Sequence, residues 1–382
     1  MTGPAALLAL EDGTVVRGWG IGAPGETFGE GVFNTGMAGY QEVLTDPSYA
    51  AQIVTMTAPQ QGNYGIHPRD AESDRIHVAG FVVREASRRA FSPGSEATLD
   101  QALASAGVTG IEGVDTRLLT RRIREAGAMR AAISTLEADP ASLLERVRRS
   151  PGMAGADLAS TVSSAEPYEA ASRVGPADPF PGRILRVAVY DFGVKRSILR
   201  SLAANGMEAT VVPATTSPSA IADGGFDGVL LSNGPGDPAA TPYGVAAAAE
   251  LLGRIPLFGI CLGHQLLGLA LGGRTYKMPF GHRGVNQPVV DAATGAVRIT
   301  SHNHGFAVDP EGWERHEDGA AVTPFGRVEP SHRNLNDDTL EGLRCLDLRA
   351  ISVQYHPEAA PGPHDARGSF GEFRALIEGR AA

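Results

Sequence analysis

One cysteine of this 382-residue chain stands between two glycines directly after an apolar run. The stretch reads GICLGHQLLG, and its Gly-x-Cys-x-Gly pattern is the cysteine counterpart of a serine nucleophile elbow. A sharp turn from strand to helix exposes the sulfur, and the positive end of the helix dipole favours the reactive thiolate. We therefore expect Cys261 to be a nucleophile. The other cysteine, Cys345, has no such setting and fits a small buried hydrophobic residue.

A thiol nucleophile needs a base and a group that orients the base. The segment AISVQYHPEAAPG alternates apolar and polar residues as a strand does, and Pro357 favours an extended conformation at His356. In an extended chain His356 and Glu358 project to the same side, so the carboxylate can hold one ring nitrogen and leave the other for the cysteine. The alternative is a surface turn in which the two residues only form an ion pair.

A third segment, LSNGPGDP, follows the apolar run DGVLL. Two glycines around a proline form a rigid turn whose backbone N–H groups can face outward, which suits an oxyanion hole. An ordinary turn would have the same composition. Together the three segments predict a triad of cysteine, histidine and carboxylate beside an oxyanion hole.

The elements that position these segments follow from the alternation after Arg183. Apolar runs at 184–192, 208–214, 227–233 and 255–260 predict strands, and the segments 194–206, 241–254 and 264–273 predict helices. The alternation predicts an α/β domain with a doubly wound, mostly parallel sheet, whose ligands bind outside the carboxyl ends of the strands. The runs VRITSHNHGFAV and RAISVQYHPE are expected to add strands that bring further residues to the same edge.

The amino-terminal half has a different sequence pattern. Residues 1–150 combine strand-like runs, such as TVVRGWGIG and AQIVTMTA, with a helix in DTRLLTRRIREAG that Asp115 caps and Gly127 ends. They predict a smaller mixed α/β domain. Residues 151–183 are rich in Pro, Ala, Ser and Gly, which predicts a linker and assigns 184–380 to the second domain.

Composition narrows the function. A formal net charge of −10 disfavours a nucleic-acid partner. The sequence has no apolar segment of membrane-spanning length and no basic leader, so we expect a cytoplasmic protein without a membrane partner. His302 and His304 alternate as two metal ligands could, but no third ligand is evident from spacing, so no metal is expected.

The order of NGPGD, GICLGHQ and HPE resembles the class I, or triad, glutamine amidotransferases. The resemblance covers the carboxy-terminal half and implies hydrolysis of L-glutamine: Cys261 attacks the side-chain amide, His356 passes a proton to the leaving ammonia, and water releases glutamate from a glutamyl thioester. Glu358 would orient the histidine. Backbone amides near Gly236 and Leu262 would stabilise the oxyanion.

The resemblance extends over the amino-terminal half. The segment EGVFNTGMAGYQEVLTDPSYAAQIVTMTAPQQGNYG is similar to the small subunit of carbamoyl-phosphate synthase, as are VYDFGVKRSILRSL, FGHRGVNQPV, HNHGFAV and HPEAAPGPHD. The resemblance implies that glutamine is bound by Ser48, Gly234, Gly236, Leu262, Gln265, Asn303, Gly305 and Phe306.

A missing motif indicates where the synthetase chemistry lies. The sequence contains no G-x-x-x-x-G-K-[ST] and only two lysines, so we expect no cofactor on this chain. The resemblance implies a large subunit that holds ATP and Mg²⁺, receives ammonia through an internal tunnel and makes carbamoyl phosphate from bicarbonate for pyrimidine and arginine biosynthesis. The amino-terminal domain is expected to dock that subunit.

Three alternatives remain at this point. An amidotransferase of the GMP-synthesis type would share the second domain, but the first-domain segment disfavours it. A catalytically inactive regulatory subunit is disfavoured because Cys261, His356 and Glu358 are all present. An α/β-hydrolase esterase would share the elbow, but its acid residue precedes its histidine by a long segment, whereas Glu358 follows His356 directly.

Overall fold

The computed structural model describes residues 3–176, 178–317 and 319–380. They form two compact units. Unit 1 comprises the chain up to Ala156 together with Met278–Gly284, and unit 2 comprises Asp157–Lys277 and the chain from Val285 onward. Among the described residues, no helix has the length and apolar character needed to cross a membrane.

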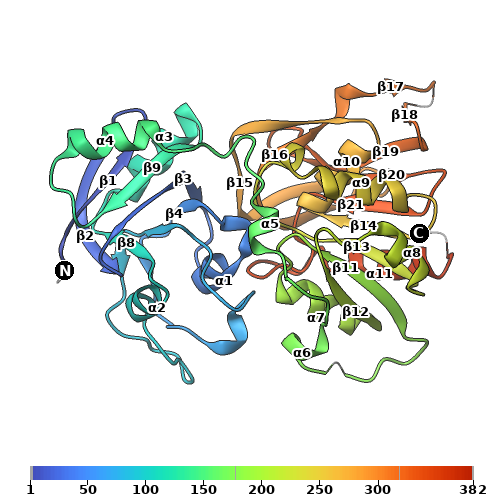
Figure 1. Ribbon diagram of the computed structural model, residues 1–382, viewed down its shortest axis with the longest axis horizontal. Coiled ribbons are helices and arrows are strands. Elements are labelled where there is room, and N and C mark those ends of the chain that lie inside the picture. The colour runs from blue at the N-terminus through green and yellow to red at the C-terminus, as the bar shows by residue number, and fades with distance from the viewer. Residues whose placement is uncertain (1–2, 177, 318, 381–382) are drawn as a thin grey trace. The chain divides into compact units, whose positions relative to one another are not determined.

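Unit 1 is built around a closed barrel of mixed strands (Figure 1). Around the barrel the order is β1 (Ala5–Leu10), β2 (Val15–Gly22), β8 (Thr109–Glu112), β6 (Gly80–Val82), β4 (Gln52–Met56), β3 (Glu26–Asn34) and β9 (Met129–Ser134). Neighbours from β8 through β6 and β4 to β3 are parallel, and the other neighbours are antiparallel. Closure leaves no unpaired sheet edge in the barrel.

The helices of unit 1 are α1 (Tyr40–Thr45), α2 (Leu99–Ser105), α3 (Thr116–Ala126) and α4 (Pro140–Arg149), and β5 (Gln60–Gln61) pairs with β7 (Glu85–Ala86). The predicted caps of α3 are confirmed. Asp115 accepts a hydrogen bond from the backbone N–H of Leu118 at 2.9 Å, and Gly127 ends the helix with φ 95°.

The sheet of unit 2 is parallel in its centre and antiparallel toward one end. Its order is β10 (Tyr168–Glu169), β12 (Met207–Pro213), β11 (Leu185–Asp191), β13 (Gly228–Leu231), β14 (Leu257–Ile260), β21 (Ala350–Val353), β20 (Leu340–Cys345), β19 (Gly326–Asn334), β15 (Arg274–Asp291) and β16 (Val297–Asp309). The strands from β12 to β21 run parallel, and β20 and β19 are antiparallel to their neighbours. A small extension pairs β17 (Glu314–Arg315) with β18 (Ala321–Thr323), and β18 with β19.

Two hydrophobic cores lie on opposite faces of this sheet. Along β11, Val187 and Val189 belong to one core, whereas Ala188 and Tyr190 belong to the other. Residues of α7 (Arg196–Ala204) and α11 (Gly368–Ile377) pack in the first core, and residues of α8 (Pro218–Asp223), α9 (Pro242–Leu251) and α10 (Leu262–Ala270) pack in the second. This arrangement confirms the predicted doubly wound α/β fold, in which both faces of each central strand are buried.

The segment 151–183, which was predicted to be a linker, contains regular secondary structure. The segment 151–183 contains α5 (Ala159–Val162), β10 and α6 (Ala171–Val174), and β10 pairs with β12. Elements of two to four residues are too short to show a hydrophobic period, which is why the sequence suggested a linker. In unit 1, the backbone N–H of Ala128 donates to Pro279 O at 2.7 Å, so a later segment of the chain completes the first unit.

Candidate active site

Four neighbouring parallel strands of unit 2 end at the predicted site. Lys195 follows β11, Asn233 follows β13, Cys261 follows β14 and His356 follows β21. The carboxyl ends of adjacent parallel strands lie at one edge of a sheet, and that edge is where ligands bind in such folds. The topology therefore gathers segments that are far apart in the sequence.

Cys261 occupies a strained turn between β14 and α10. Its φ of 53° and ψ of −102° are unusual for a residue with a side chain. A Cβ on Gly259 would lie 2.6 Å from Gly263 O, and a Cβ on Gly263 would lie 2.1 Å from Leu231 O. Both glycines are therefore required by close backbone approach, as the elbow pattern predicted.

The sulfur of Cys261 points toward β16. Its Sγ donates a weak hydrogen bond to the backbone oxygen of Asn303 at 3.7 Å. The residue is 2% exposed, so the expectation that the turn exposes the sulfur was wrong. The backbone N–H of Cys261 donates to Val353 O at 2.9 Å, which fixes the turn to β21. The nucleophile is thus held by the two strands that the sequence predicted would reach this edge.

His356 and Glu358 form the expected pair. His356 Nδ1 lies 2.7 Å from Oε1 of Glu358, and its backbone N–H donates to Ser301 O at 2.8 Å. The other ring nitrogen, Nε2, is buried and forms no hydrogen bond within the described part of the chain. The carboxylate therefore orients the ring through Nδ1, and Nε2 remains available for proton transfer.

The protonation of this pair is set by competing effects. Burial opposes protonation of His356, but the Glu358 carboxylate and the Cys261 side chain outweigh it and raise the pKa of His356 from 6.5 to about 10. Burial alone would raise the pKa of Glu358, but the charges of Lys195 and His356 hold it below its usual value of 4.5. The geometry thus favours an imidazolium beside a carboxylate at neutral pH.

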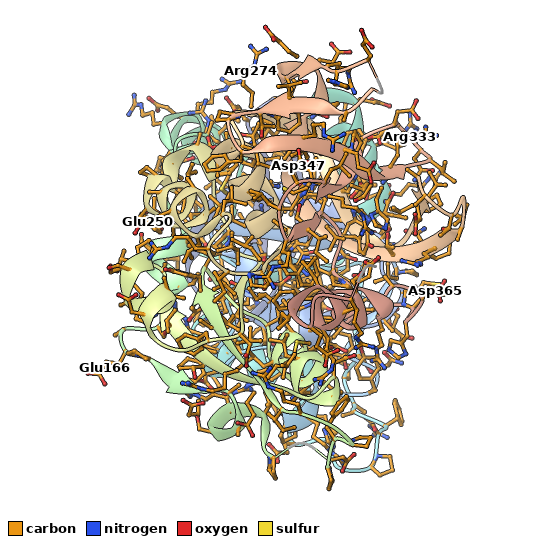
Figure 2. All side chains as sticks on the ribbon, turned by 90° about the vertical axis from the view of Figure 1, so that its right-hand side faces the viewer. Glu166, Glu250, Arg274, Arg333, Asp347 and Asp365 are labelled. Atoms are coloured by element: carbon orange, nitrogen blue, oxygen red, sulfur yellow. The ribbon has the colours of Figure 1, made fainter. Side chains whose placement is uncertain are left out.

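Lys195 is a member of the site that sequence reasoning missed. Its Nζ donates to Oε1 of Glu358 at 2.8 Å and to Ala360 O at 2.6 Å. Most charged side chains of unit 2 lie at its surface, as Figure 2 shows for Glu166, Glu250, Arg274, Arg333, Asp347 and Asp365. Lys195, one of only two lysines in the chain, is buried, and a buried lysine indicates a functional role. The spacing of residues in the sequence does not identify Glu358 as its partner.

The NGPGD segment packs against the elbow. The backbone N–H of Gly263 donates to Ser232 O at 3.1 Å, and the backbone N–H of Lys195 donates to Asn233 Oδ1 at 3.3 Å. A Cβ on Gly234 would lie 2.1 Å from Phe192 O, and Gly236 has φ 97°. This turn requires glycine at both positions, because the close approach at Gly234 and the positive φ of Gly236 exclude a side chain.

Leu262 is the first residue of α10, where a backbone N–H has no acceptor within the helix. This position beside the Cys261 sulfur suits stabilisation of a negatively charged oxygen during attack on a carbonyl. The assignment of Leu262 and Gly236 to an oxyanion hole stays a prediction.

Three of the predicted glutamine-binding residues, Asn303, Gly305 and Phe306, lie on β16. The side-chain amide of Gln265 donates to Phe306 O at 2.8 Å and to Gln354 Oε1 at 3.0 Å. Gln265 thereby joins α10 to β16 and to Gln354, the residue that follows β21. These bonds give it a positioning role in addition to the predicted contact with substrate.

The predicted residue Ser48 lies in unit 1. It is buried in the 3-10 helix Pro47–Tyr49, and its backbone N–H donates to Asp46 Oδ1 at 2.9 Å. Its role in glutamine binding stays a prediction.

His264, near the nucleophile in sequence, is poorly suited to be the base. It is completely buried, and its Nδ1 lies 2.8 Å from Ser352 Oγ. Burial lowers the pKa of His264 to about 3, so the ring is neutral. A neutral ring bonded to a serine in the core fits a packing role.

Comparison with known proteins covers both units. Residues 8–133 match the family described as the carbamoyl-phosphate synthase small chain, CPSase domain, and residues 188–376 match glutamine amidotransferase class-I. A carbamoyl phosphate synthase small chain of Syntrophotalea carbinolica is 52% identical over 98% of both chains, and one of Thermotoga maritima is 51% identical over 98% of both. A third, of Rhodopirellula baltica, is 49% identical over 98% of this chain and 96% of its own length. The chain therefore belongs to the family of carbamoyl phosphate synthase small chains.

Proposed function

We propose that this chain is the glutaminase subunit of a glutamine-hydrolysing carbamoyl-phosphate synthase. The observation that carries the proposal is the buried chain of contacts from Lys195 through Glu358 to His356 beside the strained Cys261 turn. Full-length similarity to small chains disfavours an amidotransferase of the GMP type. The complete triad disfavours an inactive regulatory subunit.

The reaction requires Cys261 as a thiolate, formed by loss of the Sγ proton, and His356 as an imidazolium. Sulfur attacks the carbonyl carbon of the glutamine side-chain amide, and the resulting oxyanion is stabilised by backbone N–H groups near Leu262 and Gly236. His356 Nε2 donates its proton to the leaving nitrogen, which departs as ammonia and leaves a glutamyl thioester. Glu358 and Lys195 keep the ring oriented during this transfer.

The second half of the reaction reverses the proton flow. Neutral His356 accepts a proton from water as the oxygen attacks the thioester carbonyl. The carbon–sulfur bond breaks, glutamate leaves, and the thiolate is restored beside the imidazolium. The net reaction converts glutamine and water to glutamate and ammonia.

The ammonia is delivered to a large synthetase subunit, which holds ATP and Mg²⁺ and makes carbamoyl phosphate for pyrimidine and arginine biosynthesis. We assign docking of that subunit to unit 1 and a cytoplasmic location to the enzyme. Mixing the two purified chains tests the partner: co-elution is expected, and separate elution would contradict it.

The decisive experiment measures carbamoyl phosphate formation by this chain with a large subunit. Cys261→Ser is expected to abolish activity with glutamine and to retain activity with ammonium chloride, because ammonium bypasses the thioester. A Cys261→Ser variant that still uses glutamine would show that the nucleophile lies elsewhere.

A further inference from the structure

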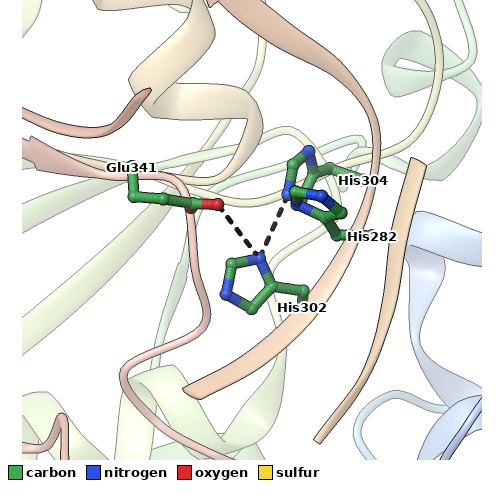
Figure 3. A group of neighbouring side chains, drawn as sticks. All are labelled: His282, His302, His304 and Glu341. Carbon is green, nitrogen blue, oxygen red and sulfur yellow. Dashed lines mark hydrogen bonds and ion pairs between the residues drawn. The ribbon is translucent and has the colours of Figure 1, made fainter. Parts of the chain in front are cut away.

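A second polar cluster lies on β16, next to the residue that contacts the nucleophile. His302 and His304 flank Asn303 and, as alternate residues of a strand, share the opposite face. Glu341 of β20 lies against them, and the three side chains are buried in unit 2 (Figure 3). His282, which is also labelled in Figure 3, belongs to unit 1 and is not one of the three.

The three ligand atoms are spaced as they would be around one small ion. His302 Nδ1 lies 3.1 Å from His304 Nε2 and 3.7 Å from Glu341 Oε1. Each of the three residues has a ligand atom that lies within 4.8 Å of those of the other two. Ligands about 2.0–2.2 Å from a tetrahedral Zn²⁺ are separated by roughly 3.3–3.5 Å, so small adjustments would close the site.

The hydrogen bonds of the two rings direct lone pairs at this point. His304 Nδ1 lies 2.9 Å from Phe306 O, and a carbonyl only accepts, so Nδ1 carries the proton and Nε2 presents a lone pair. Thr300 Oγ1 donates to Gln287 O at 2.9 Å. The hydroxyl therefore accepts from His302 Nε2 at 2.7 Å, so the neutral His302 ring has its lone pair at Nδ1.

This pattern is the one that metal sites require outside the ligands themselves. A metal-bound histidine donates its other ring N–H to a carbonyl, a carboxylate or another acceptor, which fixes the ring and its tautomer. Both rings satisfy that rule, through Phe306 O and Thr300 Oγ1. The carboxylate is also oriented, because Asn334 Nδ2 donates to Glu341 Oε1 at 3.1 Å.

We propose that His302 Nδ1, His304 Nε2 and Glu341 Oε1 bind a divalent transition-metal ion of the Zn²⁺ class. Two imidazoles and one carboxylate form a donor set that such ions favour over Mg²⁺ or Ca²⁺. The sequence alone shows only the two histidines, because Glu341 comes from another strand, and for that reason no metal was expected from spacing.

The ion would act as a positioning element. In the sheet, β19 and β15 separate β20 from β16, so the site ties together two strands that are not neighbours. The tied strand carries Asn303, whose backbone oxygen accepts from Cys261 Sγ. The alternative is a proton in the same place, which would make His302 an imidazolium paired with Glu341.

Metal binding is tested on the full-length chain after removal of any affinity tag and treatment with a chelator. Calorimetric titration with Zn²⁺ is expected to give about one ion per chain, and the ion should raise the melting temperature. His302→Gln and Glu341→Gln should each weaken binding roughly 100-fold or more, since each removes one of three ligands. His316→Gln, at an exposed histidine, is the matched control and should bind as the wild type does.

Two results would overturn the proposal. One is a wild-type chain that binds no Zn²⁺, and the other is full affinity in both ligand variants; either would assign the cluster to the proton-linked pair. If a variant does not fold, NMR of the wild-type chain with isotope-labelled cadmium and labelled imidazole nitrogens tests whether the histidines bind the metal. Cadmium coupling to one histidine Nδ1 and one Nε2 is expected, and absence of both couplings contradicts the site.

Discussion

Lys195 Nζ lies 2.8 Å from Oε1 of Glu358, and the two side chains are 3% and 0% exposed. The same oxygen accepts from His356 Nδ1. Lys195 is the N-cap residue of α7, whereas Glu358 follows β21, so the pair joins two strand ends of the sheet. The histidine that moves the proton is thereby linked to a fixed cation through one carboxylate.

Lys195→Met is expected to lower the free energy of unfolding by about 3–5 kcal/mol near pH 7, because it removes one of the two cationic partners of the buried Glu358 carboxylate. The folded-state pKa of Glu358 is lowered, so its stabilising contribution is present above its ordinary value of 4.5 and is lost as pH falls. The stability difference between wild type and variant should therefore shrink below pH 4.5.

Urea unfolding across this pH range measures the effect. Lys277→Met, at the other lysine of the chain, is the matched control because Lys277 is exposed, and it should change stability by less than about 1 kcal/mol. Equal stability of the two variants near pH 7 would show that the buried pair does not stabilise the fold.

Gly263→Ala is expected to disrupt the elbow. The added Cβ would lie 2.1 Å from the backbone oxygen of Leu231, which cannot move away as a flexible side chain could. We expect a loss of about 1–3 kcal/mol in unfolding free energy, as overpacking typically costs, together with loss of glutaminase activity.

Gly368→Ala supplies the control, since it lies in the first turn of α11 with no atom within 4 Å of the added Cβ. Alanine there should stabilise the chain by about 0.5–1 kcal/mol. Thermal melts of the two variants compare them directly. A Gly263→Ala chain that melts and hydrolyses glutamine like the wild type would refute the close-packed elbow.

The pKa values of two buried histidines are expected to be shifted in opposite directions. His356, with its pKa raised to about 10, should remain protonated at pH 8, and His264, with its pKa lowered to about 3, should remain neutral at pH 5. By linkage, the contribution of His356 to stability is present below 6.5 and is lost as pH rises through about 10.

Nitrogen NMR of the labelled imidazoles tests this, with assignments from His356→Gln and His264→Gln. A His356 signal that titrates near the ordinary value of 6.5 would remove the imidazolium from the first step of the reaction.

Gln265→Leu is expected to lower kcat/KM for glutamine roughly 10- to 100-fold, because it deletes buried hydrogen bonds to Phe306 O and Gln354 Oε1. Alkylation of Cys261 by iodoacetamide should keep its wild-type rate, since the side-chain amide of Gln265 bonds to Phe306 O and Gln354 Oε1 rather than to the sulfur.

The double variant Gln265→Leu with Gln354→Leu separates these effects. If the two residues act through their shared bond, the double variant should lose less than the sum of the single losses. Additive losses would mean that Gln265 acts on substrate independently of Gln354.

Sequence by itself determined the local features of this protein. The glycines around Cys261 predicted a turn that only glycine permits. Pro357 predicted the extended backbone that places Glu358 beside His356. Strands with apolar residues on both faces predicted a sheet covered by helices on each side, because each buried position favours an apolar residue. The closed barrel of unit 1 was not evident, since its strands read only as a mixed domain.

Tertiary structure alone decided which distant residues meet. Lys195 reaches Glu358, Gln265 reaches Phe306, and Glu341 reaches His302 across strands whose order no local pattern encodes. Secondary structure follows from periodicity within a few residues, whereas these contacts depend on how strands far apart in the chain pair and on the side-chain packing that fixes them.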